Sequence, residues 1–124
     1  FLSQIQYTGT GTTVLHRVVF YYTSSCLTKV RNVDGKDSDY TYSGGLLKTA
    51  SDIDNYLLTY TYNTPSQTWQ PYRVKSVSEK DGNADGGSLT FSYAHNQTSV
   101  TDYNGNVEIY QFNDFGNTVG KFRV

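Results

Sequence analysis

An aromatic residue, one spacer and a second aromatic residue recur five times along this chain of 124 residues. The five triplets are Phe20-Tyr21-Tyr22, Tyr40-Thr41-Tyr42, Tyr60-Thr61-Tyr62, Phe91-Ser92-Tyr93 and Tyr110-Gln111-Phe112. Their first residues are 20, 20, 31 and 19 positions apart. A period of about twenty residues is typical of repeat architectures, in which each unit packs only on its neighbours. Because side chains alternate along a strand, both rings of a triplet are expected on the same face of a sheet.

A turn residue stands five positions before four of these triplets: Gly35, Asn55, Gly86 and Gly105. Asp34-Gly35 and Asn104-Gly105 are dipeptides that type I′ hairpin turns prefer, because those turns need positive φ angles. Apolar residues before each turn indicate the partner strands: Leu27, Val30 and Val33; Leu47, Ala50 and Ile53; Val74 and Val77; Val100. Each repeat is therefore predicted to be a strand, a tight turn and an aromatic return strand.

The predicted fold is all-β, an array of about five to six antiparallel hairpins of about twenty residues forming one continuous twisted or spiralling sheet. One further hairpin is expected at the start, from 2–7 and 14–22 around a looser loop. The long third interval predicts two lengthened hairpin loops, at 63–71 and 81–87. Cross-strand aromatic pairs, each contributing about 0.5–1.5 kcal/mol, are expected to be a main source of stability.

Charge and hydropathy argue against several classes of partner. The net charge is −1, with ten basic and eleven acidic residues scattered along the chain. No basic patch for nucleic acid is therefore expected. No apolar run approaches the roughly 18 residues of a membrane helix, so membrane insertion is not expected. The single cysteine, Cys26, excludes an internal disulfide and a cysteine-based metal cage.

Candidates for chemistry are few, and we assign no catalytic residue, cofactor or metal ligand. His16 and His95 lie far apart in the sequence, His95 in a predicted turn, and nothing in their spacing supports a dyad with Cys26. The segment 81–87 alternates Asp, Asn and Asp as a calcium loop does, but lacks the Glu and flanking helices of an EF-hand. The favoured interpretation is a Gly-rich hairpin loop, with a weak surface Ca²⁺ site as the alternative.

A cluster of aromatic residues around the 63–72 loop suggests a second class of function. Exposed rings beside Asn, Gln and Asp side chains are common in sugar-binding surfaces, and Trp69 stands in this loop without apolar neighbours. The residues of this candidate carbohydrate platform are Trp69, Tyr72, Tyr62 and Tyr60. The alternative is that the rings pack against the sheet itself. Asn96-Gln97-Thr98 is also an N-glycosylation sequon, relevant only in a eukaryotic secretory host.

The repeat unit resembles the RHS or YD-repeat family. The best matching stretches run from Asp34-Gly35 through Tyr40-Thr41-Tyr42 to Leu46, and from Val100 through Asn104-Gly105 and Tyr110-Gln111-Phe112 to Asn117. The likeness covers residues 27–124, and the period carries more weight than any single motif. The sequence departs from the family at Ser43 and Asn63, where Asp is frequent, and in the insertion at 63–71.

The resemblance implies a β-hairpin ribbon that builds an enclosing shell in secreted or cell-surface proteins, most often bacterial, some of which enclose a toxin. No Asp-Pro self-cleavage motif is present. Residues 1–124 are therefore expected to be a single, non-enzymatic repeat segment of a longer chain. Its expected partners are the rest of that shell and an enclosed toxin, with a glycan as the alternative. Open edge strands predict weak self-association.

Overall fold

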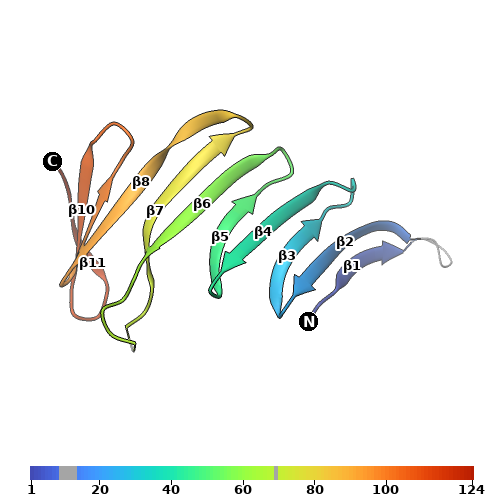
Figure 1. Cartoon of the computed structure of the whole chain (residues 1–124), viewed down its shortest axis with the longest axis horizontal. Helices are drawn as coiled ribbons and strands as arrows, with labels where there is room; N and C mark the ends of the chain where they lie inside the picture. The colour runs from blue at the N-terminus through green and yellow to red at the C-terminus, as the bar shows by residue number, and fades with distance from the viewer. Residues whose placement is uncertain (9–13, 69) are drawn as a thin grey trace. The chain divides into compact units, whose positions relative to one another are not determined.

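The chain is all-β in the part that the computed structural model describes, residues 1–8, 14–68 and 70–124 (Figure 1). The strands are β1 (Gln4–Thr8), β2 (Val14–Thr23), β3 (Cys26–Arg31), β4 (Asp37–Ser43), β5 (Leu46–Ser51), β6 (Tyr56–Asn63), β7 (Arg73–Asp81), β8 (Ala84–Ala94), β9 (Gln97–Thr101), β10 (Val107–Phe112) and β11 (Thr118–Arg123). Their order in the open sheet is their order along the chain. The predicted array of antiparallel hairpins is thus confirmed, including the additional hairpin of β1 and β2.

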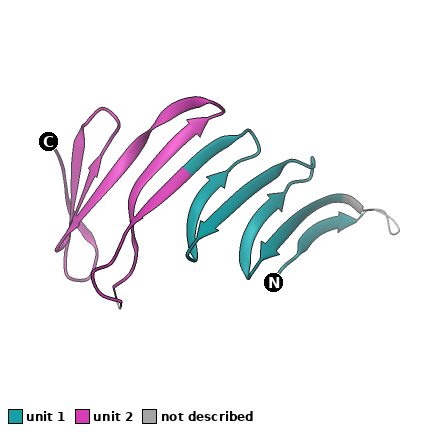
Figure 2. Cartoon of the chain, in the orientation of Figure 1, with its two compact units in different colours: residues 1–58 teal, residues 59–124 magenta. Residues whose placement is uncertain are grey.

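The chain divides into two compact units, residues 1–58 and 59–124, which are described separately (Figure 2). In the first unit, each strand from β1 to β5 pairs antiparallel with the next. In the second unit, the same is true of β7 to β11. A hydroxyl contact of 2.6 Å between Thr61 on β6 and Ser76 on β7 lies within the second unit.

The first unit has one aromatic face and one charged face. Phe20 lies opposite Val30, Tyr40 opposite Ala50 and Tyr42 opposite Leu47, so these rings and aliphatic side chains share a face. The residues between them point the other way, where Lys29 lies opposite Asp39 and Arg31 opposite Asp37. The two rings of a triplet therefore do share a face, as predicted from strand alternation.

The second unit places its rings on one face as well, but with aliphatic and hydroxyl partners. Phe91 lies opposite Val100, and Thr98 lies opposite both Tyr93 and Tyr110. An intervening non-aromatic strand therefore separates successive aromatic strands within each unit. The prediction that cross-strand aromatic pairs are a main source of stability is wrong for these strand pairs, because each ring faces an aliphatic or small residue and no such pair forms there. The stacked ring pair between described residues is Phe1 on Tyr22, with centroids 5.0 Å apart.

The second tyrosine of three triplets ties its strand to the chain segment before it. The hydroxyls of Tyr22, Tyr42 and Tyr93 donate hydrogen bonds to the main-chain carbonyls of Leu2 (3.0 Å), Leu27 (2.9 Å) and Val74 (2.7 Å). The acceptors lie 20, 15 and 19 residues before their tyrosines, each on the chain segment that precedes the strand of the tyrosine. Tyr in place of Phe at this position therefore has a structural reason, since the ring packs on the sheet while its hydroxyl is satisfied by the backbone.

Four turns share one hydrogen-bonding pattern, in the loops 32–36, 52–56, 102–106 and 113–117. The first residue, Asn or Asp, accepts hydrogen bonds on its side-chain oxygen from the main-chain N–H groups of the third and fifth residues, at 2.9 to 3.1 Å. The fourth residue has a positive φ, 78° at Gly35 and 67° at Asn55. This is a three-residue loop with a left-handed last residue.

The type I′ prediction for Asp34-Gly35 and Asn104-Gly105 is therefore wrong, because only the glycine of each pair has a positive φ. Type I′ turns need positive φ at both central residues. Ser24-Ser25 (47° and 68°) and Gly44-Gly45 (59° and 79°) meet that condition instead. Val33 and Ile53, predicted as strand residues, lie in turns and are exposed.

The structure accounts for the 31-residue interval between Tyr60 and Phe91 differently from the prediction. The loop 64–72 between β6 and β7 is lengthened as expected. The second predicted loop is not, because β7 ends at Asp81 and β8 begins at Ala84, so only Gly82 and Asn83 join them. The extra residues lengthen the two strands instead, to 9 and 11 residues.

No side chain is buried in the part of the chain that the structure describes. The rings of the aromatic face are half-buried, as the alternating exposure along β4 illustrates: Tyr40 and Tyr42 are covered more than Asp39, Thr41 and Ser43. Folded domains usually bury such a face against a second layer of structure. Within each unit, stability therefore comes from neighbouring strands, their turns and the half-covered aromatic face.

Candidate functional site

The candidate carbohydrate platform is only partly described. Tyr60 and Tyr62 lie two residues apart on β6, so they share a face, and both are half-buried. Tyr72 directly precedes β7, and its side chain is 54% exposed. Trp69 lies outside the described residues. Sequence analysis thus identified one well exposed ring in this region, Tyr72, beside two rings that belong to the aromatic face.

A polar hollow of about 410 Å³ lies beside the 64–72 loop. Its described lining includes Asn63, Pro65, Ser66, Gln70, Arg73 and Tyr93, but not Tyr60, Tyr62 or Tyr72. The loop is closed by its own hydrogen bonds: the Oε1 atom of Gln70 accepts from the Ser66 hydroxyl (2.9 Å) and from the Gln67 N–H (3.3 Å). Hydrogen bonds within the loop therefore hold Gln70, one of the residues that line the hollow, in place.

Arg73 and Tyr93 form the wall of this hollow. The guanidinium carbon of Arg73 lies 5.1 Å from the centre of the Tyr93 ring, within the range of a cation–π contact. Tyr93 is itself fixed by its hydroxyl bond to the Val74 carbonyl. The same two residues also line a second hollow of about 450 Å³, where the Asn96 amide donates to the Asp114 carboxylate at 2.7 Å.

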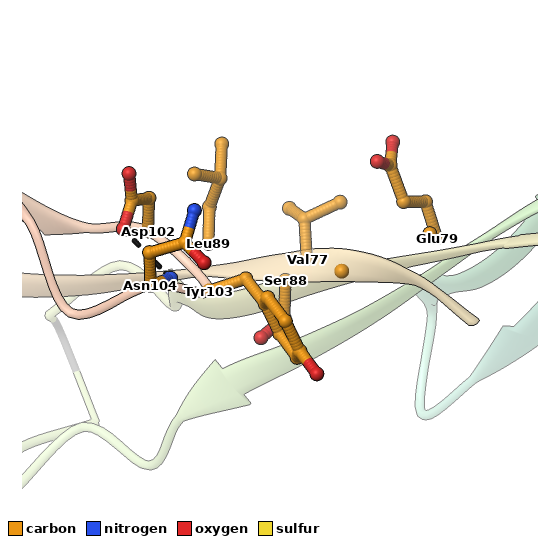
Figure 3. Close-up of a pocket in the computed structure, with 9 residues that line it drawn as sticks. Val77, Glu79, Ser88, Leu89, Asp102, Tyr103 and Asn104 are labelled. Atoms are coloured by element: carbon orange, nitrogen blue, oxygen red, sulfur yellow. Dashed lines mark hydrogen bonds between the residues drawn. The ribbon is translucent and has the colours of Figure 1, made fainter.

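A third hollow, of about 270 Å³, lies over the β7–β8 hairpin (Figure 3). Figure 3 shows Val77, Leu89 and Glu79 on one side of the ribbon and the ring of Tyr103 on the other. Asp102 accepts the main-chain N–H of Asn104 at 2.9 Å, so its carboxylate is engaged in the turn. The Asn106 side-chain amide also donates to Asp102 and lowers the pKa of that carboxyl.

The segment 81–87 consists of the end of β7, a two-residue turn and the start of β8. Residues from Ala84 onward belong to β8, and Asp85 pairs with Lys80 across the hairpin at 3.4 Å. Among the described residues, no group of three or more His, Cys, Asp or Glu side chains is placed to hold a metal ion. The predicted seven-residue hairpin loop is therefore reduced to a turn of two residues, Gly82 and Asn83, because β8 begins at Ala84.

The histidines and the cysteine do not come together within the first unit. His16 pairs with Tyr7 near the start of β2, whereas Cys26 lies opposite Thr23 at its end. Seven residues of strand separate these positions, or about 23 Å. His95 lies in the two-residue turn between β8 and β9, as predicted. A Cys26–His16 dyad is therefore ruled out by the strand geometry.

Two ion-pair clusters carry the clearest electrostatic effects. Arg31 donates two hydrogen bonds to Asp37, at 2.7 and 2.8 Å, and Lys29 adds a third at 2.9 Å. The hydrogen bonds from Arg31 are the main cause that holds the pKa of the Asp37 carboxyl well below its usual range. The same contacts raise the pKa values of Lys29 and Arg31.

The second cluster surrounds Glu108 on β10. The Tyr110 hydroxyl donates to Glu108 at 2.9 Å, Lys121 lies 3.1 Å away and Arg123 lies 3.5 Å away. The Tyr110 hydrogen bond, followed by that of Lys121, lowers the pKa of the Glu108 carboxyl. In both clusters a carboxylate is paired with neighbouring cationic side chains, as in a structural ion-pair network.

Sequence analysis missed Arg73, Gln70 and Tyr93 as residues of one hollow. Tyr93 belongs to a triplet, which predicts packing on the sheet, and Arg73 lies outside every motif. The usable signal was the pair of prolines, Pro65 and Pro71, which restrict the loop backbone directly before Arg73.

The structure contains, in its described parts, no helix that is long and apolar enough to cross a membrane. No protein-family model matches the chain. A search of curated proteins likewise gives no significant match.

Proposed function

We propose that this chain is a non-enzymatic structural segment of a secreted or cell-surface repeat protein of the RHS/YD type. Its hairpins contribute to an enclosing β-shell or scaffold, whose contents in bacterial members of that family include a toxin. The proposal rests on one observation above all. Aromatic and aliphatic side chains gather on one face of each unit, yet no described side chain is buried.

A face of this kind is stable in an assembly that supplies a covering partner, since sheets normally bury their apolar face on a second layer. The repeated turns and tyrosine ties support a building role in a second way. Among the described residues they connect segments that are adjacent along the chain, so their effect is to propagate the array. The charged clusters around Asp37 and Glu108 add ion pairs between neighbouring strands.

Cysteine labelling tests this proposal. In a Cys26→Ser background, Ala50→Cys places a thiol on the aromatic face opposite Tyr40, and Thr49→Cys places one on the other face opposite Thr41. We expect the thiol at position 50 to be protected from a maleimide in the longer natural polypeptide, but reactive in the isolated segment. The thiol at position 49 should react in both. Equal reactivity of position 50 in both proteins would overturn the enclosing role.

Carbohydrate binding near the 63–72 loop is the second candidate function. The exposed ring of Tyr72 and the polar hollow beside the same loop favour it. Titration of a glycan panel, followed by the fluorescence of the single tryptophan Trp69, tests this candidate. A saturable change, together with a loss of binding in Trp69→Ala measured by calorimetry, supports the platform; no response to any sugar removes it.

A further inference from the structure

We infer that the hollow beside the 64–72 loop binds an acidic saccharide, with Arg73 holding the carboxylate or sulfate group of the sugar. This inference deepens the carbohydrate-binding candidate and is independent of the structural role. It names a class of ligand and an anchoring residue that lie outside the aromatic platform.

The charge of the hollow favours an anion. Arg73 is the one charged side chain among its described lining residues, and none of these residues is a carboxylate. Arg73 forms no ion pair with any described residue, whereas Arg31 is held by Asp37 through two hydrogen bonds. An unpaired guanidinium presents a planar set of donors that matches a carboxylate or sulfate group.

The position of Arg73 is fixed before a ligand arrives. Its guanidinium rests over the Tyr93 ring, 5.1 Å from the ring centre. The ring is fixed in turn by its hydroxyl bond of 2.7 Å to the Val74 carbonyl. An arginine held in this way loses less side-chain entropy on binding than a mobile one, which favours affinity.

The remaining lining residues suit a sugar. The Oε1 atom of Gln70 is occupied by Ser66 and Gln67, so the side-chain amide is oriented with its Nε2 donors available to a ligand. Asn63 adds a second amide, and Pro65 and Pro71 add apolar contact. The volume of about 410 Å³ falls within the range of about 300–1,000 Å³ typical of ligand sites.

Calorimetry and amide-resolved NMR of the whole chain test the inference with three probes. These are a galacturonate trisaccharide, the corresponding neutral galactose trisaccharide and a sulfated disaccharide. We expect at least one acidic probe to bind, to shift the amide signals of Gln70 and Arg73, and to weaken with added salt. Preference for galacturonate identifies a carboxylate ligand, and preference for the sulfated probe a sulfate ligand; either result supports the inference.

Variants decide whether Arg73 is the anchor. Arg73→Gln should weaken binding about tenfold or more, since the neutral amide lacks the charge-assisted hydrogen bonds of the guanidinium. Gln70→Glu should also weaken it by adding a negative charge. Arg17→Gln removes an exposed cation of the first unit, which forms no ion pair with a described residue, and should have no effect. The circular dichroism of each variant checks that the sheet is intact.

Three results would overturn the inference. The first is equal binding of the neutral trisaccharide, unaffected by Arg73→Gln, which leaves the carbohydrate-binding candidate in place. The second is acidic-sugar binding with amide shifts away from the hollow. The third is no binding of any of these three sugars; if the wider glycan panel is also negative, the carbohydrate-binding candidate is lost too. None of these outcomes bears on the structural role, which the cysteine labelling tests separately.

Discussion

The hydroxyl of Tyr42 donates a hydrogen bond of 2.9 Å to the main-chain carbonyl of Leu27, on the strand before it. Burial raises the pKa of this hydroxyl, so it stays a neutral donor over a wide pH range. Tyr40 lies on the same face, two residues earlier, and makes no such bond to a described residue. Within one triplet, the hydroxyl of Tyr42 therefore ties two strands together, whereas Tyr40 lies opposite Ala50 without such a bond to a described residue.

Tyr42→Phe should lower the free energy of unfolding by about 1 kcal/mol, because the Leu27 carbonyl loses its donor while the ring packing is retained. Tyr40→Phe is the matched control and should change it much less. Urea unfolding followed by circular dichroism measures both. Equal effects of the two substitutions would show that the hydroxyl bond has no special weight.

Asp52→Ala should destabilise the first unit by about 1–2 kcal/mol, because the carboxylate accepts two main-chain N–H groups that the loop cannot otherwise satisfy. Asp52→Asn should restore stability, since Asn32 and Asn113 occupy the same position in sister turns. Thermal unfolding of both variants provides the comparison. A marked loss of stability in Asp52→Asn would contradict the view that Asn and Asp serve equally as the side-chain acceptor in these turns.

Gly35→Ala should cost about 1 kcal/mol because φ is +78° there, even though a Cβ atom at this position meets nothing within 4 Å. Gly35→Asn should cost less, since Asn55 adopts a φ of 67° at the same place in its turn. The difference between the two variants in urea midpoint isolates backbone strain from packing.

Acid should destabilise the first unit partly through Asp37. Its pKa lies below the usual value of 3.8 in the folded chain, chiefly because of hydrogen bonds from Arg31. Such a carboxyl stabilises the fold above its unfolded pKa, and this contribution is lost as pH falls through the folded pKa. From about pH 4 downward, wild type should therefore lose more stability than Asp37→Asn. Asp34→Asn, in an exposed turn, is the charge-matched control and should follow wild type.

Weak self-association is expected through the open edges of the sheet, at β1 and β11. All five residues of β1 are exposed, among them Ile5 at 57%. Ile5→Lys should reduce association by placing a charge on this edge strand. Phe115→Lys changes an apolar side chain that is 90% exposed in a turn, and should leave association unchanged. Sedimentation velocity over a range of concentrations distinguishes the two; a strictly monomeric wild type would refute edge pairing.

The hairpin fold was predictable because three local signals agree: the alternating aromatic residues, the turn residues and the even spacing. Turn types were less predictable, since an Asp-Gly pair suits more than one loop. The distinguishing signal is an Asn or Asp three residues before the residue with positive φ: Asn32, Asp52, Asp102 and Asn113. A pattern search that includes this acceptor would have found all four related turns.

The start of β8 could not be predicted, because Gly86 and Gly87 usually indicate a loop. In the folded chain they leave room for neighbours: a Cβ atom at Gly86 would lie 2.8 Å from the Cγ atom of Glu79, and one at Gly87 would lie 3.3 Å from the Cβ atom of Tyr103. The close approach of Glu79 at Gly86, and the turn residue Tyr103 together with a φ of +116° at Gly87, are thus the reasons for these glycines, and a local pattern does not show them.

The hollow at Arg73 depends on a distant pairing in the same way. Arg73 reaches Tyr93 from a different strand, at the end of a loop of unusual length. Residue types near Arg73 in sequence therefore carried little information about its surroundings. The antiparallel pairing of β7 with β8 brings the start of β7, with Arg73, beside the end of β8, with Tyr93.

The ties from Tyr22, Tyr42 and Tyr93 each reach back only to the chain segment immediately before their own strand. A duplicated or deleted hairpin would therefore carry its own tie with it and leave the bonds of the remaining hairpins unchanged. Gene segments of about sixty nucleotides, one repeat each, could be gained or lost by unequal recombination without redesign of the rest. The length of such a protein is then a property that evolution can adjust in steps of one hairpin.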